Sequence, residues 1–120
     1  MRSTSSLPAL LALCAVLLAG VVPIAAKRSA PAPVAPVVTN GIRYSAPSDA
    51  MAFVVAADAG TSKELWRARI YEVRVDPNLE RDVQEVFIVS LAVKDGFLLI
   101  ANERGEKYAL DLQTRKVTRQ

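Results

Sequence analysis

The stretch Val86–Lys116 constrains the fold most, because it combines apolar strand patterns with two tight-turn signals. Asp95-Gly96 supplies the positive φ angles that a type I′ hairpin turn needs. Asn102–Gly105 has the residues of a second turn ending in a left-handed glycine. The segments around these turns are apolar on one or both faces, as strands are: Val86–Val93, Phe97–Ala101 and Lys107–Leu112. The stretch therefore predicts three consecutive antiparallel strands.

Two further strands are predicted upstream. Met51–Ala57 is a short apolar run of strand-forming residues, and Asp58–Lys63 reads as a turn. Leu65–Val75 predicts a longer strand with a change of phase, because Trp66 and Ile70 share one face while Tyr71 begins an apolar set on the other. The phase change indicates either a bulge or a strand that crosses between two apolar layers.

The segment after this strand breaks the alternating pattern. Asp76 can cap a helix, Pro77 suits its first position, and the spacing of Leu79 and Val83 would place both side chains against the core. A polar loop is the alternative. The fold class predicted is mainly β: an antiparallel meander sheet of about five or six strands, which could curl into a small barrel or half-sandwich, with one short helix near residues 77–84.

The N-terminal part predicts an exported protein. Residues 1–26 have the charged start, apolar core and small-residue end of a secretory signal peptide. An uncleaved membrane anchor is one alternative, and lipoprotein processing at Cys14 is another, although Leu13 is larger than the usual residue there. Residues 27–40 are rich in proline and alanine and predict a disordered tether, so the β domain is expected over residues 41–120. Periplasm and secretion fit equally well.

Composition excludes several kinds of chemistry. The 120 residues contain no histidine, and the single cysteine, Cys14, lies in the predicted leader. Ser-His-Asp and Cys-His catalysis and the common transition-metal sites therefore have no side chains to use, and we assign no catalytic, cofactor or metal residue. The net charge of +3 is spread along the chain without a basic run, so nucleic-acid binding is not expected.

Carboxylates are the remaining candidates for catalysis. The acidic residues that follow the longer strand would spread around a short helix, and Glu103 and Glu106 sit at the two ends of a predicted turn. A small glycan-acting enzyme would need two such carboxylates within about 10 Å in a cleft. A solvated acidic surface is the simpler interpretation. The first group comprises Asp76, Glu80, Asp82 and Glu85.

Trp66, Arg67, Arg69 and Tyr71 form a candidate partner-binding site. On a regular strand Arg67, Arg69 and Tyr71 would point the same way and could meet an anion or a protein partner. Arginine and aromatic residues are the types favoured at the centres of protein interfaces. An exposed basic row beside a core tryptophan is the alternative interpretation.

The chain also contains an internal repeat. Ala56–Lys63 and Ala109–Lys116 share the pattern Ala-x-Asp-x-x-Thr-x-Lys, in which the aspartate can accept backbone N–H groups of its own turn. At these residues the sequence resembles the repeats of quinoprotein-type (PQQ-like) β-propellers, whose blades end in YALD-x-x-TGK-x-x-W. Tyr108–Val117 matches this motif with Arg115 in place of the glycine and no terminal tryptophan. Ala57–Trp66 keeps the tryptophan.

The resemblance implies about one and a half blades, of the about four to eight that close a propeller. It therefore carries over no funnel and no cofactor residues. The function expected is a non-catalytic exported binding or assembly module of the cell envelope. Its partner would be another envelope protein, or a second copy at a sheet edge. The alternatives are a propeller-repeat unit that oligomerises into a ring and the carboxylate-only enzyme. Contact with a membrane is expected only through an uncleaved leader.

Overall fold

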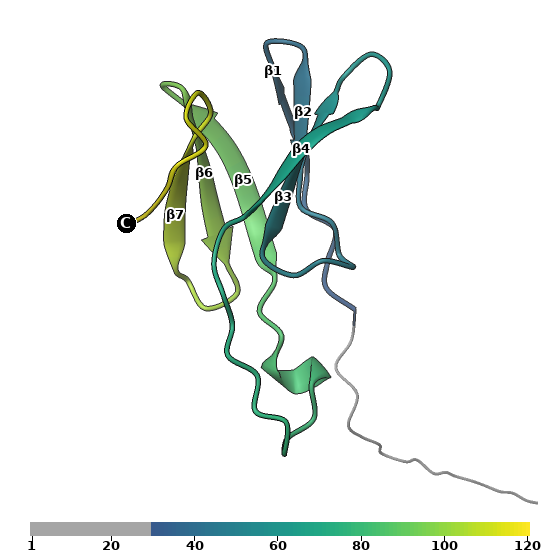
Figure 1. Cartoon of the computed structure of the whole chain (residues 1–120), viewed down its shortest axis with the longest axis vertical. Helices are drawn as coiled ribbons and strands as arrows, with labels where there is room; N and C mark the ends of the chain where they lie inside the picture. The colour runs from purple at the N-terminus through teal and green to yellow at the C-terminus, as the bar shows by residue number, and fades with distance from the viewer. Residues whose placement is uncertain (1–29) are drawn as a thin grey trace, which may run out of the picture.

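The computed structural model describes residues 30–120, and the predicted leader lies outside them. The described chain contains eight strands, arranged as two four-stranded antiparallel sheets side by side (Figure 1). The first sheet comprises β1 (Val37–Thr39), β2 (Ile42–Ser45), β3 (Phe53–Asp58) and β4 (Glu64–Arg69). The second comprises β5 (Ile88–Lys94), β6 (Phe97–Asn102), β7 (Lys107–Asp111) and β8 (Val117–Arg119).

Both sheets are meanders in which every strand pairs with the next one along the chain, in the orders β1-β2-β3-β4 and β5-β6-β7-β8. The mainly β fold and its antiparallel meander are confirmed. The strands form two sheets of four, however, rather than one sheet of about five or six, and the arrangement is not a closed barrel. The difference arises from β1, β2 and β8, which are only three or four residues long.

β1 begins inside the segment predicted as a tether. It covers Val37–Thr39 and pairs with β2, and Val34 packs against the core, so order begins before residue 41. In other respects the division into leader, tether and domain stays a prediction.

The segment between the sheets explains the change of phase in the sequence. The predicted strand Leu65–Val75 ends at Arg69, and both Ile70 and Tyr71 are buried. The Tyr71 hydroxyl donates a hydrogen bond of 2.6 Å to the carbonyl oxygen of Val86, and its ring stacks on that of Tyr108 in β7, with 5.3 Å between centroids. The strand itself does not cross between layers, because β4 ends at Arg69 and the chain that follows carries Tyr71 into the junction; the β3–β4 pair also contains a register shift between Ala56 and Ala57.

The predicted helix is reduced to a single 3-10 turn, η1 (Asp82–Gln84), seen at the bottom of Figure 1. Leu79 and Val83 are 60% and 57% exposed, so the expectation that they face the core is wrong. Hydrogen bonds of the Gln84 side chain close this loop instead. Its amide oxygen accepts the Asp76 backbone N–H at 2.6 Å, and its amide nitrogen donates to the carbonyl oxygens of Asp76 and Glu80, both at 3.0 Å. No apolar surface is needed to hold it.

A single hydrophobic cluster joins the two sheets. Leu98, Ile100 and Leu110 from the second sheet and Val54 from the first are its most fully buried large side chains. Burying one such side chain contributes about 1.5–3 kcal/mol relative to leaving it exposed. The two sheets therefore stabilise each other through their facing surfaces.

The two turns that share the sequence repeat have the same hydrogen bonds. Asp58 Oδ1 accepts the backbone N–H groups of the residues two and three positions later at 2.8 and 2.9 Å, and Asp111 Oδ1 does the same at 2.8 and 3.0 Å. These bonds lower the pKa of both carboxyl groups below their ordinary value. Ser62 and Arg115 occupy the left-handed position of each turn, at φ 66° and 65°. Ser62 and Arg115 stand where the propeller motif has glycine.

The hairpins before these turns also match. Gly41 follows Asn40 and Gly96 follows Asp95, and all four residues have positive φ, as a type I′ turn requires. The carbonyl oxygens of Gly41 and Gly96 accept the backbone N–H of Ala59 and Leu112, the residues after the two turn aspartates, at 2.9 and 3.1 Å. The second sheet is therefore a structural repeat of the first.

Candidate partner-binding site

The four residues predicted to bind a partner divide between two surfaces. Arg67 and Arg69 lie exposed on β4, on the side of the first sheet that faces away from the second. Arg67 forms an ion pair with Glu64 at 2.8 Å, and the hydrogen bond lowers the pKa of that carboxyl. Arg69 pairs with Glu72 at 2.9 Å. The Arg67 and Arg69 side chains are 47% and 55% exposed within these pairs, so both remain accessible to a partner.

Tyr71 does not point the same way as the arginines. Its side chain is buried at the junction of the sheets, and burial raises the pKa of its hydroxyl. The reason is that the chain leaves the regular strand after Arg69, which ends the strict alternation of faces.

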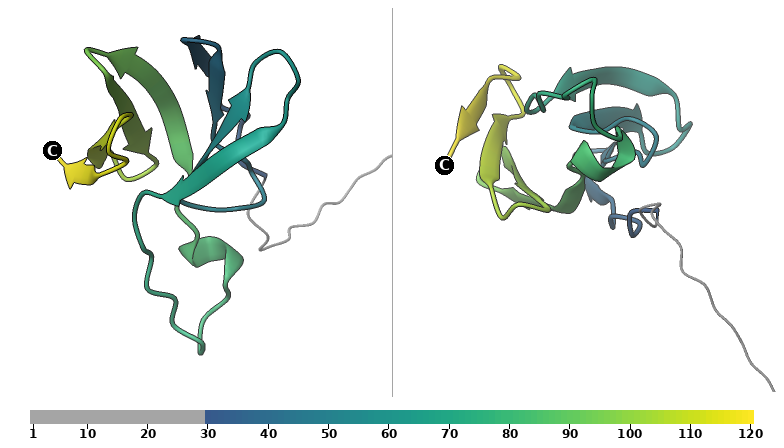
Figure 2. Two further views of the ribbon diagram at one scale, coloured as in Figure 1. Left: turned by 45° about the horizontal axis from the view of Figure 1, so that its top comes forward. Right: turned by 90° about the horizontal axis from the view of Figure 1, so that it is seen from below.

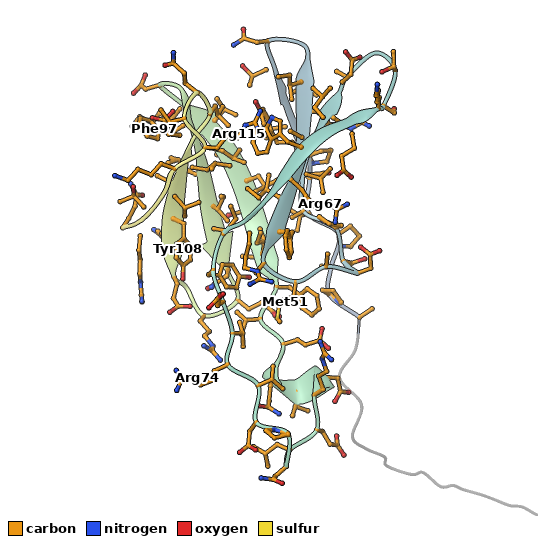
Figure 3. All side chains as sticks on the ribbon, viewed as in Figure 1. Met51, Arg67, Arg74, Phe97, Tyr108 and Arg115 are labelled. Atoms are coloured by element: carbon orange, nitrogen blue, oxygen red, sulfur yellow. The ribbon has the colours of Figure 1, made fainter. Side chains whose placement is uncertain are left out.

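Trp66 belongs to the junction as well. Its half-buried ring lies 6.0 Å from that of Tyr44 on β2, measured between centroids. The guanidinium of Arg115, from the β7–β8 turn, lies 4.5 Å from the ring centroid on the other side of the junction (Figure 3). This is within the distance of a cation–π interaction. Sequence reasoning did not assign Arg115 to the site. The sequence offered a signal, because Arg115 replaces the motif glycine in the second repeat, and the first repeat retains the motif tryptophan, Trp66.

Arg69 and Tyr71 line an open groove of about 860 Å³ at the lower margin of the first sheet. Met51 lies beside them, and its sulfur accepts the backbone N–H of Val86 at 3.0 Å (Figure 3). Asp49, Glu72, Arg74 and Arg81 place both signs of charge around the groove. The groove is thus polar and wide, without the convergent groups of a small-molecule site.

The outer surface of the second sheet, which we call the open face, has an apolar centre and polar ends. The apolar residues are Ala92, Phe97, Leu99, Ala101 and the buried Ala109, and the polar residues opposite Phe97 and Ala101 on the neighbouring strands are Ser90, Lys94, Lys107 and Asp111. Side chains alternate along each strand, so the buried Leu98 and Ile100 face the first sheet and these residues face away from it. Ala92, Leu99 and Ala109 lie directly opposite one another across β5, β6 and β7. Phe97 is 39% exposed at one end of the row.

Two of the acidic residues considered for catalysis, Glu103 and Glu106, make contacts within the second half of the chain. Glu103 accepts the backbone N–H of Phe87 at 2.8 Å, and Glu106 pairs with Arg119 at 3.0 Å. Within residues 30–120 no group of three or more acidic, histidine or cysteine side chains could hold a metal ion. The same part of the chain contains no helix that is long and apolar enough to span a membrane.

Two four-stranded antiparallel meanders packed through their faces are the architecture of adjacent β-propeller blades (Figure 2). No protein-family model and no curated protein sequence matches the chain. Among solved structures, the chain resembles the crystal structure of BamB from Moraxella catarrhalis, with a TM-score of 0.51 and 17% identity. The match covers 70% of this chain and 24% of that one. The resemblance of the fold to β-propeller blades is thus confirmed, with two four-stranded sheets where the sequence motifs implied about one and a half blades.

Proposed function

We propose that the protein is a non-catalytic binding or assembly module of the cell envelope that holds its partner on the open face of the second sheet. The observation that carries the proposal is the apolar group formed by the exposed Ala92 and Phe97 and the half-buried Leu99 on one outward surface, with the buried Ala109 beside Leu99. Lys94 and Thr118 lie at its margins and are exposed. An apolar centre with a polar rim is the usual anatomy of a protein interface.

The placement in the envelope depends on the leader predicted from residues 1–26. The likeness to BamB, at 17% identity, supports the fold of such a module alone. Both periplasmic and secreted forms agree with the proposal.

Site-specific photocrosslinking in intact cells tests the proposal. A photoreactive amino acid is placed at Phe97 or at Ala92, both exposed on the open face. The matched control is Leu79, which is apolar and 60% exposed but lies in the connection between the sheets. We expect discrete adducts from the two face positions and none from Leu79. Equal adducts at all three positions, or none at the face, would contradict the proposal.

Arg67 and Arg69 are proposed as a second, weaker contact, because both guanidinium groups lie exposed on the outer side of the first sheet. Because this side lies opposite the open face, replacing both by alanine should leave the adducts at Phe97 and Ala92 unchanged and should reduce adducts from a photoreactive residue at Leu65, which is exposed on the same outer side as the arginines. If partner binding is unchanged by the double substitution, these arginines have no part in it.

A further inference from the structure

The repeat relates the open face of the second sheet to a surface that is already packed. When the two sheets are aligned on their glycine hairpins and turn aspartates, Tyr44 of β2 corresponds to Leu99 of β6, and Ala56 of β3 to Ala109 of β7. Tyr44 and Ala56 are buried against the second sheet. Their counterparts, Leu99 and Ala109, lie on the open face. The open face is therefore the equivalent of the surface through which the first sheet binds the second.

The converse relation holds for the outer surface of the first sheet. Leu110, on the inner face of the second sheet, corresponds to Ala57, and Val93 corresponds to Val38. The buried Leu98 and Ile100 correspond to Arg43 and Ser45, so the outer surface of the first sheet has the same geometry but is more polar. Val38, 61% exposed, and the nearby Leu65, 48% exposed, give this outer surface an apolar component. The two outward surfaces of the chain are thus equivalent to the two halves of the contact that joins its own sheets.

The charges on the outer surface of the first sheet weaken such a contact without preventing it. Arg67 and Arg69 are each neutralised by an ion pair with a glutamate of the same sheet margin. Arg43 donates a hydrogen bond of 3.2 Å to the Ser62 hydroxyl at the turn. A partner that covers this surface therefore desolvates two ion-paired guanidinium groups and the Arg43 guanidinium, which is hydrogen-bonded to a neutral hydroxyl, and this desolvation reduces the affinity of the contact.

We propose that a second copy of the chain occupies the open face, with the outer surface of its first sheet packed on the second sheet of its neighbour. This inference rests on the proposed function and names the partner of the same face. A head-to-tail contact of this kind repeats from copy to copy and ends only when the last copy meets the first. Since one chain spans 24% of the BamB chain that it resembles, a ring of about four copies is expected.

The contact between copies is weaker than the contact within the chain. Trp66 pairs with Ala56 on β3, and the residue in the same place opposite Ala109 is Thr118. The position of Arg115 is taken in the first sheet by Ser62. The stack of guanidinium on indole is therefore absent between copies, and the ring should dissociate to monomers on dilution.

Complementation between two variants of the full chain tests the inference. Leu99→Glu places a charge on the open face, and Leu65→Glu places one on the outer surface of the first sheet, where that residue is exposed. Each variant alone keeps one intact surface and should be monomeric by native mass spectrometry and light scattering. Mixed, they should form a 1:1 dimer and nothing larger, while the wild-type chain forms the ring. Leu79→Glu, a charge of the same kind in the connection, should leave the ring intact.

Three results would overturn the inference: a wild-type chain that stays monomeric at every concentration, a Leu65→Glu variant that dimerises alone, or a mixture without the 1:1 dimer. The second would indicate symmetric pairing of two open faces. If Leu99→Glu fails to fold, as judged by circular dichroism, Ala92→Glu on the same face takes its place. Adducts at Phe97 with a different envelope protein, from a chain that never self-associates, would preserve the proposed function and remove only this inference.

Discussion

The contact between Trp66 and Arg115 offers a direct measurement of how strongly the two sheets hold each other. Three variants are needed: Trp66→Leu, Arg115→Ala and the double substitution. The guanidinium lies 4.5 Å from the ring centroid, and the indole is half-buried, so the interaction should be worth about 1 kcal/mol. Arg115→Ala leaves the residue at φ 65°, where alanine is as strained as arginine, so its cost reports the lost contact.

We expect Arg115→Ala to lower the free energy of unfolding by about 1 kcal/mol and Trp66→Leu by about 2 kcal/mol, since leucine also loses ring contact with Tyr44. The double variant should lose about 1 kcal/mol less than the sum, and this difference is the coupling energy. Urea unfolding of the full chain, followed by circular dichroism, measures all four forms.

Lys116→Ala provides the control, because Lys116 carries the same charge one residue further along. Its cycle with Trp66→Leu should show coupling below about 0.3 kcal/mol, within the usual range for independent sites. If the Arg115 cycle gives a coupling no larger than that, or if the two cycles agree, the stack does not join the sheets and our account of the junction is wrong.

Two further predictions concern hydrogen bonds. Tyr71→Phe removes the hydrogen bond of 2.6 Å to the Val86 carbonyl oxygen and should lower the free energy of unfolding, measured in urea, by about 1 kcal/mol. A change smaller than the experimental error of that free energy would show that this hydrogen bond does not contribute to stability. Folding lowers the pKa of Asp58 and Asp111, so their turns contribute stability above the unfolded pKa that is lost as pH falls through the folded value. Between about pH 5 and pH 2 the wild-type Tm should therefore fall more than that of an Asp58→Asn, Asp111→Asn double variant, and parallel curves would refute this assignment.

The sequence predicts the second sheet well because its strands and turns carry strong local signals. Asp95-Gly96 and the repeat at Asp58 and Asp111 correctly place three turns, since each depends on a few residues and their own backbone. β5, β6 and β7 have seven, six and five residues, enough for the alternation of side chains to be recognised in the sequence. The phase change at Tyr71 also indicates a departure from the regular strand, although not the end of the strand at Arg69.

The remaining elements could not be read because their signals are short or depend on tertiary contacts. β1 and β8 have three residues each, too few for a pattern. The division into two sheets depends on the end of β4 at Arg69, and the change of phase at Tyr71 does not by itself show that the strand ends there. In the candidate site, Tyr71 was assigned to the surface on the assumption of a regular strand, and the importance of Arg115 depends on a contact across 49 residues of sequence with Trp66.

The order of the strands has a consequence for how the chain acquires its structure. Every pairing in either sheet joins strands that are consecutive in the chain, so each sheet can form by the addition of one hairpin after another. The loops between paired strands are short, and forming each hairpin therefore costs little chain entropy. Proteins dominated by such local contacts reach the native state quickly for β proteins. The first sheet is complete in sequence at Arg69, before any strand of the second begins. During synthesis, which starts at the N-terminus, the first sheet should therefore form before the second. Its apolar face should stay exposed to water while residues 70–87 are added, and the chain should gain most of its stability only when the second sheet has formed and covers that face.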